Sequence, residues 1–153
     1  MKERFWNILL LSTIVAIVIA LLPCLSAAQA HKAISLAGAE SKLPFSDGIV
    51  AGNTLYIAGQ EGRTSDGKLA VGGTAGETRI ALETIQKILT AAGFQMKDLV
   101  SVNVFLADMS DFAEMNKVYA SIMPDPKPAR ATVQVSGLVG GAHVEISAIA
   151  VKQ

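Results

Sequence analysis

Residues 74–93 read TAGETRIALETIQKILTAAG, and this stretch carries the clearest structural signal in the chain. Its apolar side chains recur every three or four residues, at Ala81, Ile85, Ile88, Leu89 and Ala92. Because that spacing places them on one face, it predicts an amphipathic helix from Thr74 to Ala92. Thr74 and Glu77 match a capping box at its start, and Gly93 suits the left-handed position that ends a helix.

The segment after this helix predicts the sheet on which the helix packs. Residues 99–106 read LVSVNVFL, and their alternation predicts a strand with one wholly apolar face. That face comprises Val100, Val102, Val104 and Leu106. Further strands are predicted at residues 32–36, 46–50, 54–58, 131–135 and 144–151, with a hairpin turn at Gly52-Asn53. A second helix begins at a cap formed by Ser110 or Asp111 and is stopped by Pro124.

Two helices on one face of a mixed sheet form an α+β sandwich, which leaves the other face of the sheet open. We place four apolar side chains on that open face: Val133, Val135, Ile146 and Ala148. Such a patch is costly to leave in water. We therefore expect a partner subunit to cover part of the sheet.

The first 30 residues differ in composition from the rest of the chain. Their charged residues all lie at the start, at Lys2, Glu3 and Arg4. An uncharged run from Phe5 to Leu22 follows, and Ala28-Gln29-Ala30 fits a signal-peptidase site. This pattern predicts a cleaved signal peptide over residues 1–30 and one domain over residues 31–153, periplasmic or secreted. An uncleaved membrane anchor is the alternative, because the apolar run is long for a signal peptide. It is nevertheless short for a spanning helix, which needs about 20 apolar residues.

Composition excludes several classes of protein. The 153 residues include 13 Lys and Arg against 13 Asp and Glu, and 51% of them are hydrophobic. These values exclude a disordered chain and a nucleic-acid binder that relies on bulk positive charge. Cys24 is the single cysteine, and the two histidines, His31 and His143, are far apart in sequence. The sequence has no metal-ligand spacing and no phosphate-binding glycine motif, so we expect neither a metal nor another cofactor.

Arg130 is the first candidate for chemistry. It follows Pro128, where a stiff proline-rich segment enters a strand. A guanidinium at such a place can hold a carboxylate through two parallel hydrogen bonds. From the residue pattern alone, a weak surface ion pair is the simpler interpretation.

Glu145 is the second candidate, because it is the single charge within the predicted strand 144–151. A buried carboxylate needs either a partner or a function. We expect two consecutive strands to bring Glu145 near Arg130. A structural ion pair between the two is therefore the alternative to an active site.

Four further positions are open to a structural interpretation as well. Asn116 lies on the second helix and fits a solvated polar position. Gly59 begins a glycine-rich segment, predicted as a loop to Gly73, and either admits a ligand close to the backbone or simply forms a turn. Phe45 is either a pocket wall or part of the core. We assign no role to His143.

Six segments occur in a characteristic order and spacing: LYIAGQ (55–60), ILTAAG (88–93), VNVFLADM (102–109), FAEMNKVY (112–119), PARATVQV (128–135) and VEISAIA (144–150). Together they resemble the Rid (YjgF-type) family of reactive-intermediate imine deaminases. The resemblance runs from about residue 33 to the C-terminus. The segments around Arg130 and Glu145 are the most specific of the six.

The resemblance implies a chorismate-mutase-like fold and a homotrimer with a cleft between each pair of subunits. It implies hydrolysis of 2-imino or enamine acids to 2-keto acids and ammonia, with no metal and no covalent nucleophile. Arg130 would then hold the substrate carboxylate, and Glu145 would assist the attacking water. Gly59, Asn116 and Thr132 would line the same cleft. The expected ligands are small 2-imino and 2-keto acids, with no nucleic-acid partner and no membrane association after signal cleavage.

This chain departs from the family pattern at several positions of the implied site. Phe45 stands where Tyr is usual, Ala58 where Ser is usual, and Thr132 where Cys or Ser is common. Ser147 replaces the second Glu of a Glu-Ile-Glu motif. Two hydroxyl groups that could orient substrate or water are therefore missing. This indicates a bulkier or more apolar imino acid, weak activity or a binding role.

Two functions from different classes stay open at this point. One is an exported imine or enamine deaminase with Arg130 and Glu145 as catalytic residues and Phe45, Ala58, Gly59, Asn116 and Thr132 around the substrate. The other is a non-catalytic binder of small carboxylates, or a chaperone-like trimer, that uses the same cleft. A ribonuclease is disfavoured, because the chain lacks both an excess of positive charge and a pair of neighbouring histidines.

Overall fold

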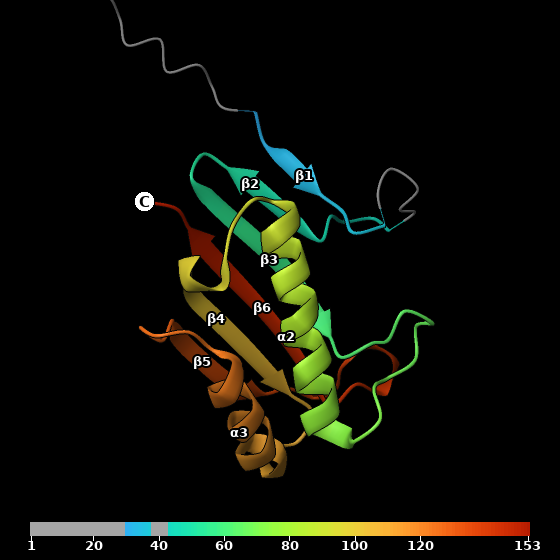
Figure 1. The fold of residues 1–153 in the computed structure, drawn as a ribbon. Helices are drawn as coiled ribbons and strands as arrows, with labels where there is room; N and C mark the ends of the chain where they lie inside the picture. Colours follow the sequence, from blue (N-terminus) through green and yellow to red (C-terminus); the bar gives the residue numbers. More distant parts are fainter. Residues whose placement is uncertain (1–29, 38–42) are drawn as a thin grey trace, which may run out of the picture.

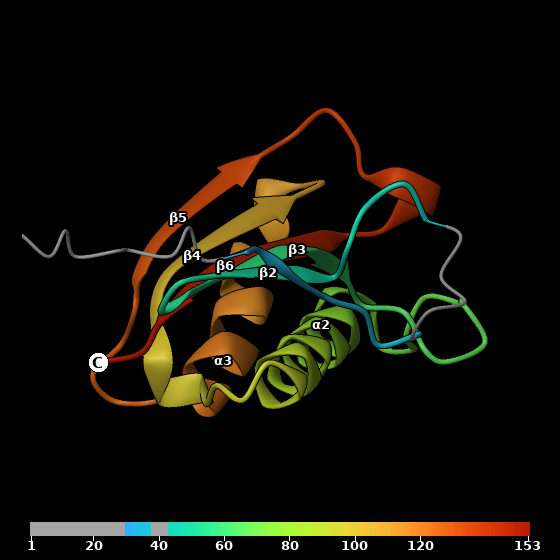
Figure 2. The same cartoon turned by 90° about the horizontal axis from the view of Figure 1, so that it is seen from above.

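Among the described residues, six strands form one mixed sheet, and two helices cover a single face of it (Figure 1). The computed structural model describes residues 30–37 and 43–153. The strands are β1 (Lys32–Ile34), β2 (Gly48–Ala51), β3 (Thr54–Glu61), β4 (Leu99–Leu106), β5 (Ala129–Gln134) and β6 (Val144–Val151). The helices are α2 (Gly73–Ala91) and α3 (Phe112–Ile122). Seen from above, both helices lie on the same side of the sheet, which confirms the predicted α+β sandwich (Figure 2).

The predicted order of helices and strands along the chain is confirmed. The hairpin turn lies at Gly52-Asn53, where Gly52 adopts a positive φ of 63°. Gly93 follows α2 with a φ of 78°, as expected of the residue that ends it. The third strand is longer than predicted and runs to Glu61, so Gly59 lies within a strand and does not begin a loop.

Most of the predicted signal peptide, residues 1–29, lies outside the described residues. Ala30, at the predicted cleavage site, is the first described residue and is exposed. Among residues 30–37 and 43–153, no helix is both long and apolar enough to cross a membrane.

The order of the strands across the sheet is β1-β2-β3-β6-β4-β5. All neighbouring strands are antiparallel except β4 and β5, which run parallel and are joined through α3. The last strand in sequence therefore lies inside the sheet, and β5 forms one edge. Because β4 separates β5 from β6, the expectation that these consecutive strands bring Glu145 near Arg130 is wrong within one protomer.

The core lies between the sheet and the two helices. Its largest fully buried apolar side chains come from both layers: Leu55, Leu82, Ile85, Ile88, Leu89, Val102, Val104, Leu106, Met115, Val144 and Ile146. Burying one such side chain stabilises the fold by about 1.5–3 kcal/mol. The apolar face predicted for α2 is therefore the face that packs on the sheet.

The open face of the sheet carries fewer of the predicted side chains than expected. Ile146 and Ala148 are buried beneath the helices, because the alternation along β6 points them toward the core. Val133 does lie on the open face, where it is exposed, and Val135 is half-buried beyond β5. Tyr56 on β3 is also exposed there. An apolar surface therefore remains on this face.

The start of β4 contains a bulge that alternation in the sequence did not reveal. Its pairing with β6 shifts register between Leu99 and Ser101. As a result Leu99 is buried and Val100 is 46% exposed, so the predicted place of Val100 on the apolar face is wrong. From Val102 onward the alternation follows the prediction.

The first turn of α2 is held by partners other than those of the predicted capping box. Gly72 precedes the helix with a φ of 97°, and no side chain in the described part of the chain caps it. Thr74 donates a hydrogen bond from Oγ1 to the Asp111 carboxylate at 2.6 Å. The buried Glu77 carboxylate accepts a hydrogen bond from the backbone N–H of His143 at 2.8 Å and contacts its Nδ1 at 2.7 Å. These contacts join α2 to the segments that begin α3 and β6.

The contact between Glu77 and His143 makes stability depend on pH. The Glu77 hydrogen bond, together with the charges of Glu77 and Asp111, raises the pKa of His143 above its ordinary 6.5. The pair therefore stabilises the fold below about pH 6.5, and this contribution is lost as pH rises through the folded-state pKa. We predict that His143→Gln lowers the free energy of unfolding more at pH 6 than at pH 9, by a few tenths to about 1 kcal/mol for a partly solvated pair. Urea denaturation at the two pH values measures the difference.

Glu77→Gln provides the matched control for this prediction. The amide still offers an oxygen to the His143 backbone N–H but removes the negative charge. In that background the pH-dependent part of the His143→Gln effect should disappear. An equal loss at both pH values in the otherwise unchanged protein would contradict the assignment.

Candidate functional site

The seven predicted site residues fall into two groups on opposite faces of the sheet. One group lies between α3 and β5: Asn116, Arg130 and Thr132. The other lies on the open face or at its rim: Phe45, Ala58, Gly59 and Glu145. The register fixes this division, because Arg130 pairs with Val102, which is buried beneath the helices. Glu145 pairs instead with Phe105, whose side chain leaves the opposite face.

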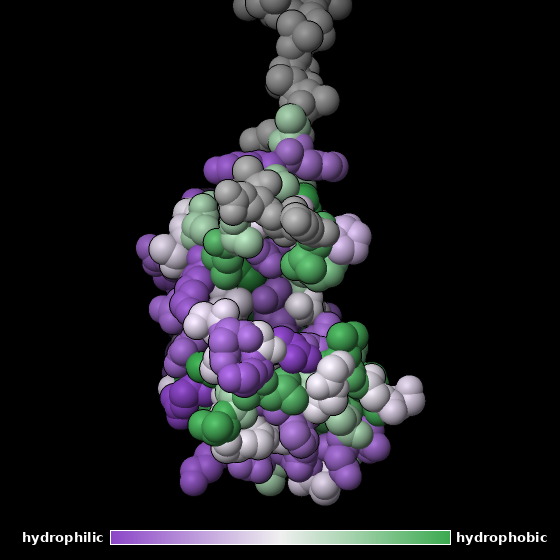
Figure 3. All heavy atoms as spheres, turned by 90° about the vertical axis from the view of Figure 1, so that its right-hand side faces the viewer, coloured by the Kyte–Doolittle hydropathy of each residue, from purple (hydrophilic) through white to green (hydrophobic). Residues whose placement is uncertain are grey.

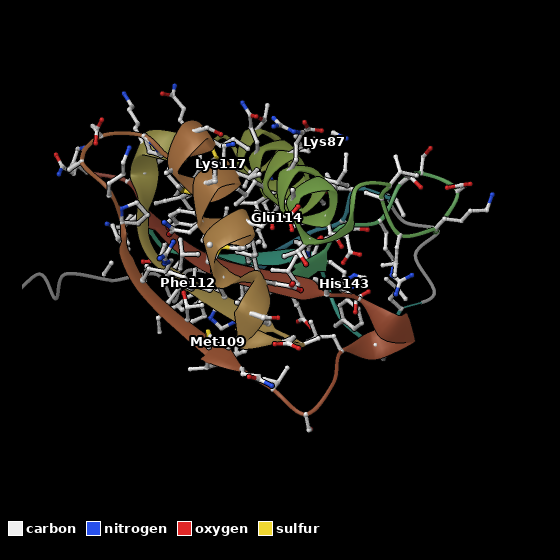
Figure 4. All side chains as sticks on the ribbon, turned by 90° about the horizontal axis from the view of Figure 1, so that it is seen from below. Lys87, Met109, Phe112, Glu114, Lys117 and His143 are labelled. Carbon is white, nitrogen blue, oxygen red and sulfur yellow. The ribbon has the colours of Figure 1, made fainter. Side chains whose placement is uncertain are left out.

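Arg130 is held in a defined orientation at the edge of the sheet. Its Nη2 donates a hydrogen bond to Asn116 Oδ1 at 2.8 Å. Its guanidinium carbon lies 4.4 Å from the centre of the Tyr119 ring and 5.8 Å from that of Phe112. Within the described segments no carboxylate pairs with it, so the alternative of a surface ion pair is not supported. Figure 4 shows Phe112 beside Met109 at the N-terminal end of α3, where both are partly exposed and provide an apolar surface.

Two polar atoms near Arg130 are buried without a hydrogen-bond partner among the described residues. They are the hydroxyl oxygens of Tyr119 and Thr132. Burial raises the pKa of Tyr119, while the positive charge of Arg130 acts in the opposite direction. Tyr119 therefore stays a neutral phenol. Buried polar atoms usually bond to a protein group, a water or a ligand, so these two indicate where a polar molecule can bind.

A pocket of about 680 Å³ opens at the end of β3 and the start of β6. Its mouth is formed by exposed apolar side chains: Leu43, Phe45 and Val139. Figure 3 looks onto this end of the molecule and shows apolar side chains interspersed with polar ones. Phe45 is thus a pocket wall and not part of the core. Three carboxyl groups also line the pocket: Asp47, Glu61 and Glu145. Even so, the described residues contain no group of His, Cys, Asp or Glu side chains arranged to hold a metal ion.

Gly59 makes room for the Glu145 carboxyl group. A Cβ atom at position 59 would lie 1.7 Å from Glu145 Oε1, so any other residue there would displace the carboxyl group. The strand is irregular at this point, because its pairing with β6 shifts register between Ile57 and Gln60. The glycine therefore sets the position of Glu145 in the pocket.

Glu145 is placed to exchange a proton. It is half-buried, and no basic side chain pairs with it in the part of the chain that the structure describes. Burial raises the pKa of Glu145, and the charge of Glu61 raises it further. A carboxyl group with a raised pKa is a better proton acceptor near neutral pH than an ordinary one.

Three residues at these two places were missed by the sequence reasoning. Tyr119 was given no role in the site, although its ring packs on Arg130. Glu61 and Arg63 line the pocket and form an ion pair with each other. The sequence did contain a signal for this ion pair, because Glu61 and Arg63 are two residues apart at the end of a strand and side chains at that spacing point to the same side.

The chain is similar to known proteins over most of its length. The family described as Endoribonuclease L-PSP matches residues 37–152. A RutC family protein of Pyrococcus horikoshii is 46% identical over 113 residues, which cover 72% of this chain and 88% of the relative. The 2-iminobutanoate/2-iminopropanoate deaminase of Mus musculus is 41% identical over 124 residues, 80% of this chain and 92% of that protein.

Solved structures give the same answer. The crystal structure of the YjgF gene product from E. coli has a TM-score of 0.73 and 30% sequence identity to this chain. It matches 80% of this chain and 99% of the YjgF chain. Sequence pattern, relatives and fold thus agree, and this chain belongs to the Rid (YjgF) family.

Proposed function

We propose that this protein is a homotrimeric hydrolase that converts reactive 2-imino or enamine acids to 2-keto acids and ammonia. One observation carries the proposal: Arg130 and Glu145 lie on opposite faces of the same sheet. A small molecule cannot reach both within one protomer. A site that uses both must therefore combine the β5 edge of one protomer with the pocket of the next.

The surface of the protomer supports such an assembly. The edge strand β5 and the open face present exposed apolar side chains, including Tyr56 and Val133. A contact between two different surfaces of the same chain closes into a ring when the rotation between copies allows it. A three-fold ring would cover the open face and form three equivalent clefts.

Arg130 would bind and orient the substrate. One of its N–H groups is used by Asn116, and the described residues provide no hydrogen-bond partner for the others. The free part of the guanidinium can hold the substrate carboxylate through two hydrogen bonds. Stacking on Tyr119 fixes the plane of the guanidinium, which places the adjacent C=N group at a constant position.

Glu145 would handle the protons. A water molecule adds to the carbon of the protonated imine, and Glu145 accepts one of its protons as the C–O bond forms. The same proton then passes to the nitrogen of the tetrahedral intermediate. The C–N bond breaks and ammonia leaves while Glu145, ionised again, takes the remaining hydroxyl proton, so that the C–O bond becomes the carbonyl of the 2-keto acid. This proton then passes to the departing ammonia or to solvent. An enamine first takes a proton on carbon and then follows the same steps.

The names of the relatives support this choice of reaction. The mouse protein is named for two small apolar 2-imino acids. Phe45, Ala58 and Val139 give this pocket an apolar side as well. A hydrophobic imino acid side chain is therefore the substrate group that fits the pocket best.

A non-catalytic binder of small carboxylates is the second candidate. Ala58 and Phe45 carry no hydroxyl group, so neither can orient a water molecule. Calorimetry with 2-keto acids, together with imine hydrolysis measured on the same sample, separates the two candidates. Binding without acceleration of hydrolysis would favour the binder. The family description also names an endoribonuclease, but 13 acidic residues against 13 basic ones leave the chain no excess of positive charge to attract RNA, which disfavours that activity.

We also propose that the protein is exported and that the signal peptide is removed after Ala30. The uncharged run and the small residues at its end support this. N-terminal sequencing of protein recovered outside the cytoplasm tests it. A membrane-bound product that still begins at Met1 would identify an anchor.

We predict that Arg130→Ala lowers kcat/KM by the equivalent of about 2–5 kcal/mol, because it removes a charged contact with the substrate. The kcat/KM of Arg130→Lys should fall between those of Arg130→Ala and the unmodified protein, since an ammonium keeps the charge but cannot form the two parallel hydrogen bonds. An amino-acid oxidase that generates the imino acid, coupled to detection of the keto acid, measures the rates.

Arg79→Ala is the control, because Arg79 is an exposed arginine on α2, away from both groups of site residues. Size-exclusion chromatography and thermal unfolding show whether each variant keeps its assembly and fold. An Arg130→Ala protein that is folded and fully active would remove the proposed role.

We predict that Gly59→Ala lowers kcat more than it raises KM. The new methyl group occupies the place of Glu145 Oε1, so the carboxyl group must turn away, while Arg130 stays free to bind the carboxylate. Steady-state kinetics on an apolar imino acid measures the two parameters. An unchanged kcat in Gly59→Ala would show that the position of the Glu145 carboxyl group does not matter.

A further inference from the structure

The Arg63 side chain joins three segments around the pocket. Its guanidinium forms an ion pair with Glu61 at the end of β3. It also donates hydrogen bonds to the carbonyl oxygen of Gly67 at 3.1 Å and to that of Val139 at 2.8 Å. One side chain therefore connects β3, the loop that follows it and the turn at Val139–Gly141.

The surrounding backbone is shaped to accept this guanidinium. A Cβ atom at Gly140 would lie 2.4 Å from Arg63 Nη2, and Gly140 has a positive φ of 61°. The end of β3 is also tightly packed, because a Cβ atom at Gly62 would lie 2.1 Å from the Cα of Glu77. Arg63 thus extends from a fixed strand end toward a turn that leaves space for it.

The ion pair lies directly beside Glu145. Glu61 and Glu145 are register partners on β3 and β6, and adjacent partners point to the same face of a sheet. The remaining charged group that lines the pocket in the described residues is Asp47, whose carboxylate accepts a hydrogen bond from the Leu36 backbone N–H at 2.7 Å. Glu61 is therefore the charge that Glu145 experiences most directly, and Arg63 is the cation that balances it.

We propose that Arg63 and Glu61 are positioning residues for Glu145: Arg63 balances the Glu61 charge next to Glu145 and fastens the turn that carries Val139 at the mouth of the pocket. This inference rests on the proposed function in assigning Glu145 a part in proton transfer. Neither residue touches the reacting atoms. Arg63 acts on the reaction through Glu61 and through Val139.

Two consequences follow for the chemistry. If Arg63 is lost, the unbalanced Glu61 charge favours the protonated form of Glu145, so more of the protein lacks a proton acceptor at a given pH. The same loss frees the Val139 turn, which weakens the contact with an apolar substrate and raises KM. If Glu61 is made neutral instead, Glu145 ionises more readily.

The test uses Arg63→Gln, Glu61→Gln and the double variant in the full chain. The ¹³C NMR signal of the Glu145 carboxyl group, assigned with Glu145→Gln, is followed against pH, and kcat/KM is measured over the same range. We expect the titration of Glu145 to move to higher pH in Arg63→Gln and to lower pH in Glu61→Gln. In the Glu61→Gln background, the further change Arg63→Gln should move it little. At a pH below the midpoint, kcat/KM of Arg63→Gln should fall severalfold.

Lys68→Gln is the matched control, because Lys68 belongs to the same loop but pairs with the exposed Asp66. It should leave the Glu145 titration unchanged. The proposal is overturned if Glu61→Gln does not move that titration, a result that can be obtained even where Arg63→Gln fails to fold. It is also overturned if Arg63→Gln has its full effect in the Glu61→Gln background. A protein that shows the expected shifts but hydrolyses no imine would refute the proposed function and leave the coupling of these residues intact.

Discussion

The position of β4 between β5 and β6 is the constraint on which the proposed site depends. β4 and β5 are joined through α3 and run parallel, and β6 pairs antiparallel with the other side of β4. The register then sends Arg130 toward α3 and Glu145 toward the open face. If the proposed site uses both residues, each protomer presents one half of it at each of two separate surfaces, and the complete site requires contact between copies.

Each half-site is held by contacts that leave its reactive group available. Asn116 and Tyr119 fix the Arg130 guanidinium, and none of the described carboxylates neutralises it. Gly59 leaves space for the Glu145 carboxyl group. Burial raises the pKa of this group, because burying the protonated form costs less free energy than burying the charged form. In the proposed function these two groups serve as an anion-binding group at one surface and a proton acceptor at the other. Unpaired groups of this kind reduce stability, and they are typical of functional sites.

Local patterns in the sequence predicted much of the fold, whereas features that depend on pairing between distant strands were missed. The helix around Ile85 and the strand at residues 99–106 follow from side-chain periodicity, which is a local property. The exposure of Val100 and the burial of Ile146 depend on a bulge and on strand order, which periodicity does not contain. In the same way, the residue pattern singled out Arg130 and Glu145 and the family resemblance implied their roles, but their placement on opposite faces and the contacts of Glu61 and Arg63 arise only from tertiary structure.

Hybrid trimers test most directly whether two protomers build one site. Arg130→Ala and Glu145→Gln subunits, each inactive alone, are mixed in equal amounts, unfolded and refolded together. Random assembly gives about one quarter of the interfaces an intact Arg130 from one subunit and an intact Glu145 from its neighbour. If two protomers share one site, imine hydrolysis should return to about that fraction of the unmodified protein's activity. Every protomer in the mixture lacks one of the two residues, so a site contained within one protomer would stay inactive. Mixed trimers as inactive as the separate variants would therefore contradict a site shared between protomers.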